Sequence, residues 1–302
     1  MWRGIAIGTC LPLFLGGVLS GQAQRTTPSP NDGQAVPKPL QPGTEAAIAQ
    51  DAGRVKRLMN EGARIEGKHV TVWFPPALSG PEAESLASRL DAGVAELRRL
   101  IGTHDWQAIG TQRATFYLVD EPRFTSYARS GAIFVSVASM KAGRVAFLGG
   151  AVLELLRPKS GGPPTDSDPV WLTRGVQEYL AQAVGPQVGL NEPDFLGVGP
   201  SAEADQRCAS LATSAEGKLM LSYVGVSRRP AELMGPEASK YQPPFLSCSL
   251  SFVKFLIDQV GVEGVVSLFG AIPANNVDAA VERLMKRPLA TLRDEWRRRI
   301  GI

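Results

Sequence analysis

The hydrophobic pattern along the chain changes its period. Three segments of the first half alternate apolar and polar residues, or are rich in β-branched and aromatic residues, which predicts strands over 69–75, 114–119 and 132–137. Residues 81–101 instead place apolar side chains three or four positions apart, which predicts an amphipathic helix.

The later part of the chain predicts mainly helices. Residues 144–156 are apolar on nearly every side, which is typical of a buried helix. A loop rich in proline and glycine, 158–169, separates it from a helix predicted over 170–184. Further helices are expected over 202–213, 246–259, 262–269, 276–285 and 288–300. Strands followed by helices predict the α+β class.

The first residues read as an export signal, assigned to 1–23. Arg3 precedes an apolar run of about 15 residues at 5–19, and small residues at 21–23 offer a cleavage site. That run is shorter than the roughly 20 residues of a membrane-spanning helix, which favours a cleaved signal peptide. The alternative is that the segment stays uncleaved as an N-terminal anchor. No later stretch is read as long enough to span. We therefore expect an exported protein, periplasmic or extracellular, without a transmembrane segment in its mature form.

Residues 24–66 are interpreted as a flexible tether followed by a short helix. Five prolines lie among small polar residues in 24–43, and such a segment cannot bury a core. Apolar residues at helical spacing then predict a helix over 44–60. The folded domain is placed at 67–302.

The net charge and the cysteines indicate which partners to expect and in which compartment the protein resides. The chain has 32 basic and 29 acidic residues, a net charge of +3 that gives no basis for nucleic-acid binding. Cleavage of the signal removes Cys10 and leaves Cys208 and Cys248, 40 positions apart. Two cysteines in an oxidising compartment usually pair, so a disulfide is predicted, with two buried free thiols as the alternative.

Few motifs that carry chemistry are present. The chain has two histidines, His69 and His104, and no G-x-S-x-G nucleophile elbow. Residues 62–69 resemble a phosphate-binding loop, but that motif needs Ser or Thr where His69 stands, and it opens a helix rather than a strand. They are interpreted as an ordinary loop.

The stretch 144–184 combines a buried helix, a loop and a second helix that contains WLTRGVQEYLA. It resembles the active-site region of the gluzincin zinc metallopeptidases, in particular their peptidase MA-like branch. In that family the first helix carries H-E-x-x-H, which supplies two zinc ligands and the general base. The second opens with W-L-x-E-G-x-A-x-Y, whose first glutamate is the third ligand. The matching residues here are Trp171, Leu172, Gly175 and Tyr179.

The resemblance covers roughly residues 67–300 and includes the segments HVTVWFPPAL, ATFYLV and SLSFVKFLIDQVGVEGVVSLF. It implies a zincin-like fold. Such a fold has a small N-terminal β-sheet with helices, two central helices of the active-site type and a helical C-terminal half.

The positions of the family's chemistry hold other residues. In order along the motif they are Gly150, Ala151, Glu154 and Arg174. A shift by one residue would place Gly149, Gly150 and Leu153 on the first helix instead. An arginine at a ligand position repels a cation. We therefore expect no zinc, unless the register is different, and no peptidase activity by the family mechanism.

The same replacements suggest a structural substitution. Glu154 and Arg174 stand where family ligands converge on one metal, so we hypothesise a partly buried ion pair that replaces the metal bridge between the two helices. Glu178 lies one turn after Arg174 and is expected to share it. The alternative is that both residues face solvent without pairing.

The resulting functional expectation is an exported, catalytically inactive metallopeptidase-like protein that acts as a binding or scaffold module. In the active family an edge strand pairs with the substrate backbone, and 132–137 occupies the matching place. We expect a peptide or partner chain to bind there by strand addition. The alternatives are a hydrolase with a non-standard site built on carboxylates such as Asp168, and a purely structural envelope protein.

Overall fold

The computed structural model describes residues 45–110, 112–121, 124, 126–129, 131–142, 146–159, 169–189 and 199–302, without the side chains of 146 and 147. The expected signal peptide 1–23, the tether up to residue 44 and Asp168 lie outside the described residues. Residues 48–302 form one compact unit.

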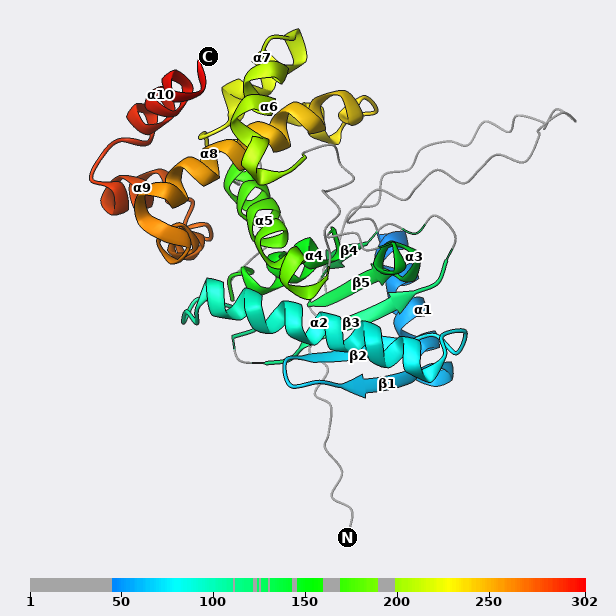
Figure 1. Ribbon diagram of the computed structural model, residues 1–302. Helices are drawn as coiled ribbons and strands as arrows, with labels where there is room; N and C mark the ends of the chain where they lie inside the picture. The colour runs from blue at the N-terminus through cyan, green and yellow to red at the C-terminus, as the bar shows by residue number, and fades with distance from the viewer. Residues whose placement is uncertain are drawn as a thin grey trace, which may run out of the picture. The chain divides into compact units, whose positions relative to one another are not determined.

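The described residues form a mixed α+β fold (Figure 1). Their sheet has five strands in the order β1-β2-β3-β5-β4. The strands are β1 (Ala63–Glu66), β2 (Val70–Phe74), β3 (Ala114–Val119), β4 (Tyr127–Arg129) and β5 (Ala132–Ser136). β2, β3 and β5 run parallel, whereas β1 and β4 are antiparallel strands at the two edges.

Alternating strand residues pack helices onto both faces of the sheet. Phe116 of β3 belongs to the same core as the buried stripe of α2 (Gly80–Ile101). The next residue, Tyr117, faces the other way and packs in a second cluster with Leu58 of α1 (Glu45–Glu61). This division follows from the two-residue period of a strand. Figure 1 shows α2 on one side of the sheet and α1 on the other.

Helix α2 has clear end signals in the sequence. The backbone N–H of Ser79 donates to the Glu82 carboxylate at 3.3 Å, and Pro81 stands in the first turn, where its missing N–H is not needed. Gly102 ends the helix with a φ of +75°, a conformation that glycine adopts without strain.

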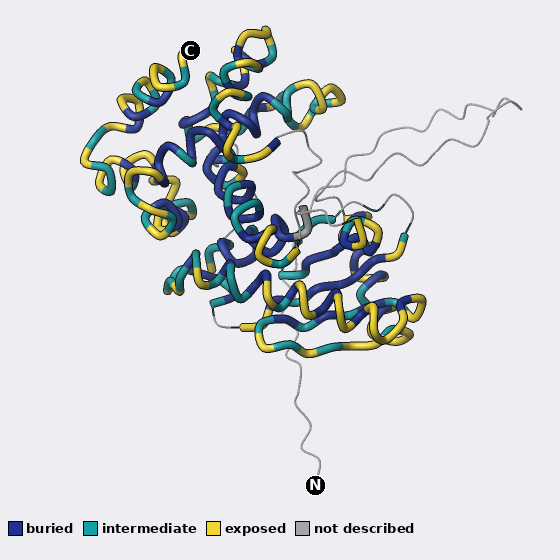
Figure 2. Tube along the Cα trace, viewed as in Figure 1, coloured by how far each residue is buried: buried dark blue, intermediate teal, exposed yellow. Residues whose placement is uncertain are grey.

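The remaining elements are mostly helical. The α-helices are α3 (Val137–Lys141), α4 (Ala146–Leu155), α5 (Val170–Val184), α6 (Ala204–Leu211), α7 (Ala215–Tyr223), α8 (Ala238–Ser267), α9 (Val277–Met285) and α10 (Leu289–Ile300). Short 3-10 helices are η1 (Gly185–Val188), η2 (Ser201–Glu203), η3 (Ala231–Met234) and η4 (Leu268–Ala271). Figure 2 shows the buried residues concentrated in the sheet and where α5 meets α8.

Helices α5 and α8 are packed at very short range. A Cβ on Gly175 of α5 would lie 2.5 Å from the Ser249 carbonyl oxygen and 2.5 Å from Val253 Cγ2 of α8. Only a residue without a side chain permits this approach. Gly175 is one of the residues that match the family pattern, and its role here is to bring the two helices together.

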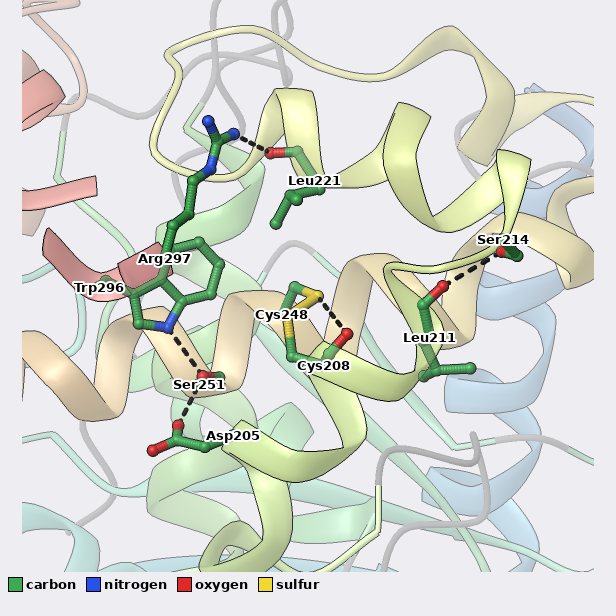
Figure 3. Close-up of a disulfide and its surroundings, with 9 residues drawn as sticks. All are labelled: Asp205, Cys208, Leu211, Ser214, Leu221, Cys248, Ser251, Trp296 and Arg297. Atoms are coloured by element: carbon green, nitrogen blue, oxygen red, sulfur yellow. Dashed lines mark hydrogen bonds between the residues drawn. A yellow bond between two sulfur atoms is a disulfide. The ribbon is translucent and has the colours of Figure 1, made fainter. Parts of the chain in front are cut away.

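A buried polar chain and a disulfide connect the C-terminal helices (Figure 3). The Trp296 indole N–H of α10 donates to Ser251 Oγ of α8 at 2.9 Å, and that hydroxyl donates to Asp205 Oδ1 of α6 at 2.6 Å. Cys208 of α6 and Cys248 of α8 form a disulfide, with their Cα atoms 4.7 Å apart. The structure thus contains the pair expected from the sequence.

Helix α8 changes one sequence interpretation. We expected no later stretch of spanning length, but Ala238–Ala271 is long and apolar enough to cross a membrane by length and composition. In the folded unit 67% of its most apolar segment is buried, as in the core helix of a soluble protein. Its apolar residues therefore have a packing role that composition alone does not reveal.

Two further expectations need correction, and one is confirmed. Residues 62–69, interpreted as a loop, contain strand β1, which pairs with β2. The two helices expected over 246–259 and 262–269 are confirmed, because they meet at Gly261, whose φ of +75° is non-helical, although the first of them begins earlier, at Ala238. Residues 132–137 were expected to form an edge strand, but β5 lies between β3 and β4. The edge is β4, which is too short to show a periodic pattern.

Candidate functional site

The hairpin of β4 and β5 meets helix α4 at the edge of the sheet. A Cβ on Gly150 of α4 would lie 3.0 Å from Ile133 Cγ2 and 3.7 Å from Ala128 Cβ. Ala128 and Ile133 are cross-strand partners in the hairpin. Gly150 therefore lets α4 lie directly on the two strands.

Glu154 lies one turn after Gly150, on the same face of α4. Its Oε2 accepts a hydrogen bond from Arg157 Nε at 2.9 Å, and the carboxylate also accepts the backbone N–H of Gly131. Gly131 forms the turn between the strands with a φ of +85°. Glu154 thus fastens the hairpin turn to the end of α4.

Burial dominates the electrostatics of Glu154, which is 4% exposed. Loss of solvation raises the pKa of its carboxyl above the ordinary value of 4.5, against the lowering effects of the Arg157 charge and of hydrogen bonds from Arg157 and Gly131. The role of this carboxyl is structural, because it accepts hydrogen bonds from Arg157 and Gly131.

The opposite side of the glycine pair faces α5. A Cβ on Gly149 would lie 2.6 Å from Gln177 Nε2, and Gln177 Oε1 accepts a hydrogen bond from Arg174 Nη1 at 2.9 Å. In the alternative alignment with H-E-x-x-H, shifted by one residue, Gly149 takes the position of the first histidine. This position faces α5. Adjacent glycines thus serve two interfaces, one with α5 and one with the hairpin.

The ion pair expected between Glu154 and Arg174 stays a prediction, and the ion pair that the structure describes for Glu154 is with Arg157. Glu154 pairs with Arg157, three residues later, whereas the Arg174 side chain is exposed on α5 and donates to Gln177. On α4, Glu154 shares the face of Gly150 toward the hairpin, while α5 packs on the face of Gly149. Ala151 lies in the hydrophobic core, and Glu178 is buried on α5.

The two histidines make local contacts elsewhere. His104 Nε2 lies 2.9 Å from the Ile101 carbonyl oxygen, and its ring stacks on Trp106. The backbone N–H of His69 donates to Asp91 at 2.6 Å. Within the described ranges, no group of three His, Cys, Asp or Glu side chains is arranged to hold a metal ion.

A polar network on the other face of β4 was missed by the sequence interpretation. Asp51 of α1 accepts hydrogen bonds from the Tyr127 hydroxyl, from Arg129 Nη1 at 2.7 Å and from Arg54 Nη1 at 3.3 Å. Burial, together with the hydrogen bond to Asp51, raises the pKa of Tyr127. The only sequence signal was an acid and a base three positions apart on a helix, which gives no hint of a strand partner.

No family model and no curated protein sequence matches this chain. Among the described strands β4 pairs with β5 alone, so no described strand pairs with the backbone groups on its other side. Side chains from α1 and α4 hold this strand on both faces of the sheet.

Proposed function

We propose that this chain is an exported, non-catalytic relative of the gluzincin metallopeptidases, with a zincin-like fold, which binds an extended peptide along the outer edge of β4. The observation that carries the proposal is the fixed position of this antiparallel edge strand. Asp51 holds it through Tyr127 and Arg129, and Glu154 holds the turn that follows it through Gly131.

The order of elements supports the assignment to this class. A mixed sheet with an antiparallel edge strand is followed by the buried helix α4, by α5 and by a helical C-terminal part. Helix α4 contacts both the edge hairpin and α5. Gly175, which matches the family pattern, lies at the α5–α8 contact.

The residues at the former catalytic positions support a binding role instead of hydrolysis. Gly149 and Gly150 carry no side chain that could act on a substrate, and the carboxyl of Glu154 accepts hydrogen bonds from Arg157 and Gly131. In neither register does the general-base position of the motif carry an ionisable side chain, because that position is Ala151 or Gly150. Backbone pairing needs none of these groups.

The two edges of the sheet differ in their suitability for strand addition. The exposed edge strand β1 carries Arg64 and Glu66, whose side chains form an ion pair, and Arg113 pairs with the same glutamate. Charged side chains of this kind protect an edge from additional strands. β4 instead directs its charged side chain, Arg129, to Asp51. This difference favours β4 as the binding edge.

The disulfide supports the expected compartment. Cys208 and Cys248 pair between α6 and α8, and such bonds persist in oxidising compartments. A periplasmic or extracellular location is therefore proposed together with the peptide-binding role.

The test is a titration of the isotope-labelled mature protein with a capped heptapeptide that alternates threonine and valine between terminal lysines. Saturable amide shifts confined to 127–129 and the neighbouring strand are expected, and the same peptide with N-methyl groups on alternate residues should not bind. Shifts confined elsewhere, or no binding by this peptide, would overturn the proposal and favour a purely structural role. Stoichiometric zinc together with peptide cleavage would overturn the non-catalytic assignment.

A further inference from the structure

A second candidate site lies at the carboxyl ends of two parallel strands. A cavity of about 160 Å³ opens where β2 and β3 end, between these strands and α1. Its apolar wall includes Leu58 of α1, Pro75 after β2, and Val119 of β3. Open sheets with parallel strands bind small molecules at this end of the strands, and the volume is enough for several water molecules or a small organic molecule.

One ion pair forms a fixed part of the cavity wall. Arg54, which is 9% exposed, donates to the Glu121 carboxylate from Nη2 at 2.7 Å and from Nε at 3.1 Å. The hydrogen bond from Arg54 is the largest influence on Glu121 and lowers its pKa, so this carboxylate stays charged. The Arg54–Glu121 pair is therefore neutral as a unit and is already satisfied.

Two further charged side chains line the cavity and have bonding capacity left. The Arg57 side chain makes one hydrogen bond in the described part of the chain, from Nη2 to Glu121 at 2.9 Å, so its remaining guanidinium N–H groups are available. Asp120 forms no hydrogen bond or ion pair with any residue that the structure describes, and it is exposed. One available cation and one available anion thus adjoin the same apolar wall.

We propose that this cavity binds a free α-amino acid with a small apolar side chain. The ligand's carboxylate accepts hydrogen bonds from Arg57, its ammonium group donates to Asp120, and its side chain lies on Leu58 and Val119. Both ligand charges are needed because the cavity offers one available charge of each sign. A simple anion would meet Asp120, and a simple amine would leave Arg57 without a new partner. The proposal is independent of peptide binding at β4.

The probe is L-valine, added to the intact exported protein and followed by calorimetry and by amide shifts of 57–58 and 118–121. Isobutylamine, which lacks the carboxylate, and isovalerate, which lacks the ammonium group, are the matched ligands. Saturable valine binding is expected, and each single-charge ligand should bind about 10-fold to 100-fold more weakly, as expected for loss of a charged hydrogen bond.

Two variants separate the roles of the charged side chains. Arg57→Gln should remove the preference for valine over isobutylamine, and Asp120→Asn the preference for valine over isovalerate. Arg99→Gln, on the exposed side of α2 where Arg99 pairs with Glu96, is the control and should leave valine affinity unchanged. No saturable binding of valine, equal affinity for the three ligands, or full affinity in both cavity variants with native melting curves would overturn the proposal.

Discussion

The Glu154 carboxylate accepts a hydrogen bond from Arg157 Nε at 2.9 Å, at the point where α4 meets the turn between β4 and β5. Because the same carboxylate also accepts the Gly131 N–H, it joins a helix end to a glycine turn. This relationship gives a structural reason for an acid at position 154.

Replacement of this acid by an apolar residue should weaken the hairpin. Glu154→Leu leaves the Gly131 N–H and the Arg157 guanidinium without their acceptor, so we expect the free energy of unfolding to fall by about 2–3 kcal/mol. Chemical denaturation measures the loss, and hydrogen exchange should increase first at Gly131. Glu237→Leu, which removes an exposed pair with Lys240, is the control and should change stability by less than about 1 kcal/mol. Equal losses in both variants would contradict this role.

The pH dependence of Glu154 has a defined sign. Burial raises its pKa in the folded state above the ordinary 4.5, so the folded state holds this proton more tightly than the unfolded state. The stabilising contribution is complete below the unfolded pKa and is lost as pH rises through the folded pKa. Relative to Glu154→Gln, which cannot titrate here, the natural protein should lose stability as pH rises above about 4.5. Denaturation curves over this range measure the difference, and a difference that grows in favour of the natural protein would be the contrary result.

The Arg54–Glu121 pair should show the opposite pH sign. Hydrogen bonding from Arg54 lowers the Glu121 pKa, so its contribution is present above the ordinary 4.5 and is lost as pH falls through the folded pKa. We expect Arg54→Gln to cost about 2 kcal/mol at neutral pH. This is below the value for a fully buried pair because the Glu121 side chain is 36% exposed. The deficit measured by denaturation should shrink in acid, and a deficit independent of pH would argue against the pair.

The disulfide between α6 and α8 closes a loop of 40 residues. A double replacement, Cys208→Ala with Cys248→Ala, should lower stability by about 4 kcal/mol on the loop-entropy estimate. Both cysteines are fully buried, so a reductant should act slowly on the folded protein. Denaturation midpoints with and without reductant test both statements. An unchanged midpoint in the double variant would show that the bond does not stabilise the fold.

Two glycines on helices form a matched pair for testing close packing. Gly175→Ala places a Cβ 2.5 Å from the Ser249 carbonyl oxygen, so α5 and α8 must separate and stability should fall by about 1–3 kcal/mol. Gly53→Ala on α1 meets nothing within 4 Å and should be neutral or stabilise by up to about 1 kcal/mol. Thermal melts of the two variants should therefore shift in opposite directions or by very different amounts. Comparable losses would mean that helix propensity and not packing governs both sites.

Sequence periodicity was informative wherever an element was long or strongly apolar. The helix expected over 170–184 has the same bounds as α5, and the strand expected over 114–119 has those of β3. The three-residue strand β4 and the charged strand β1 were missed, because neither contains enough apolar positions to define a period. The network around Asp51 was missed with them, since its partners lie on β4.

The sequence by itself determined most of the elements, the α+β class and the absence of an H-E-x-x-H motif, because these depend on residue type and on local spacing. It also predicted the pairing of Cys208 with Cys248. Only the tertiary structure decided that β5 is an interior strand, that Glu154 binds Arg157 and Gly131, and that Gly149 faces α5. These relationships depend on strand order and on the rotation of each helix about its axis. Both are set by contacts between residues distant in sequence, which no local pattern records.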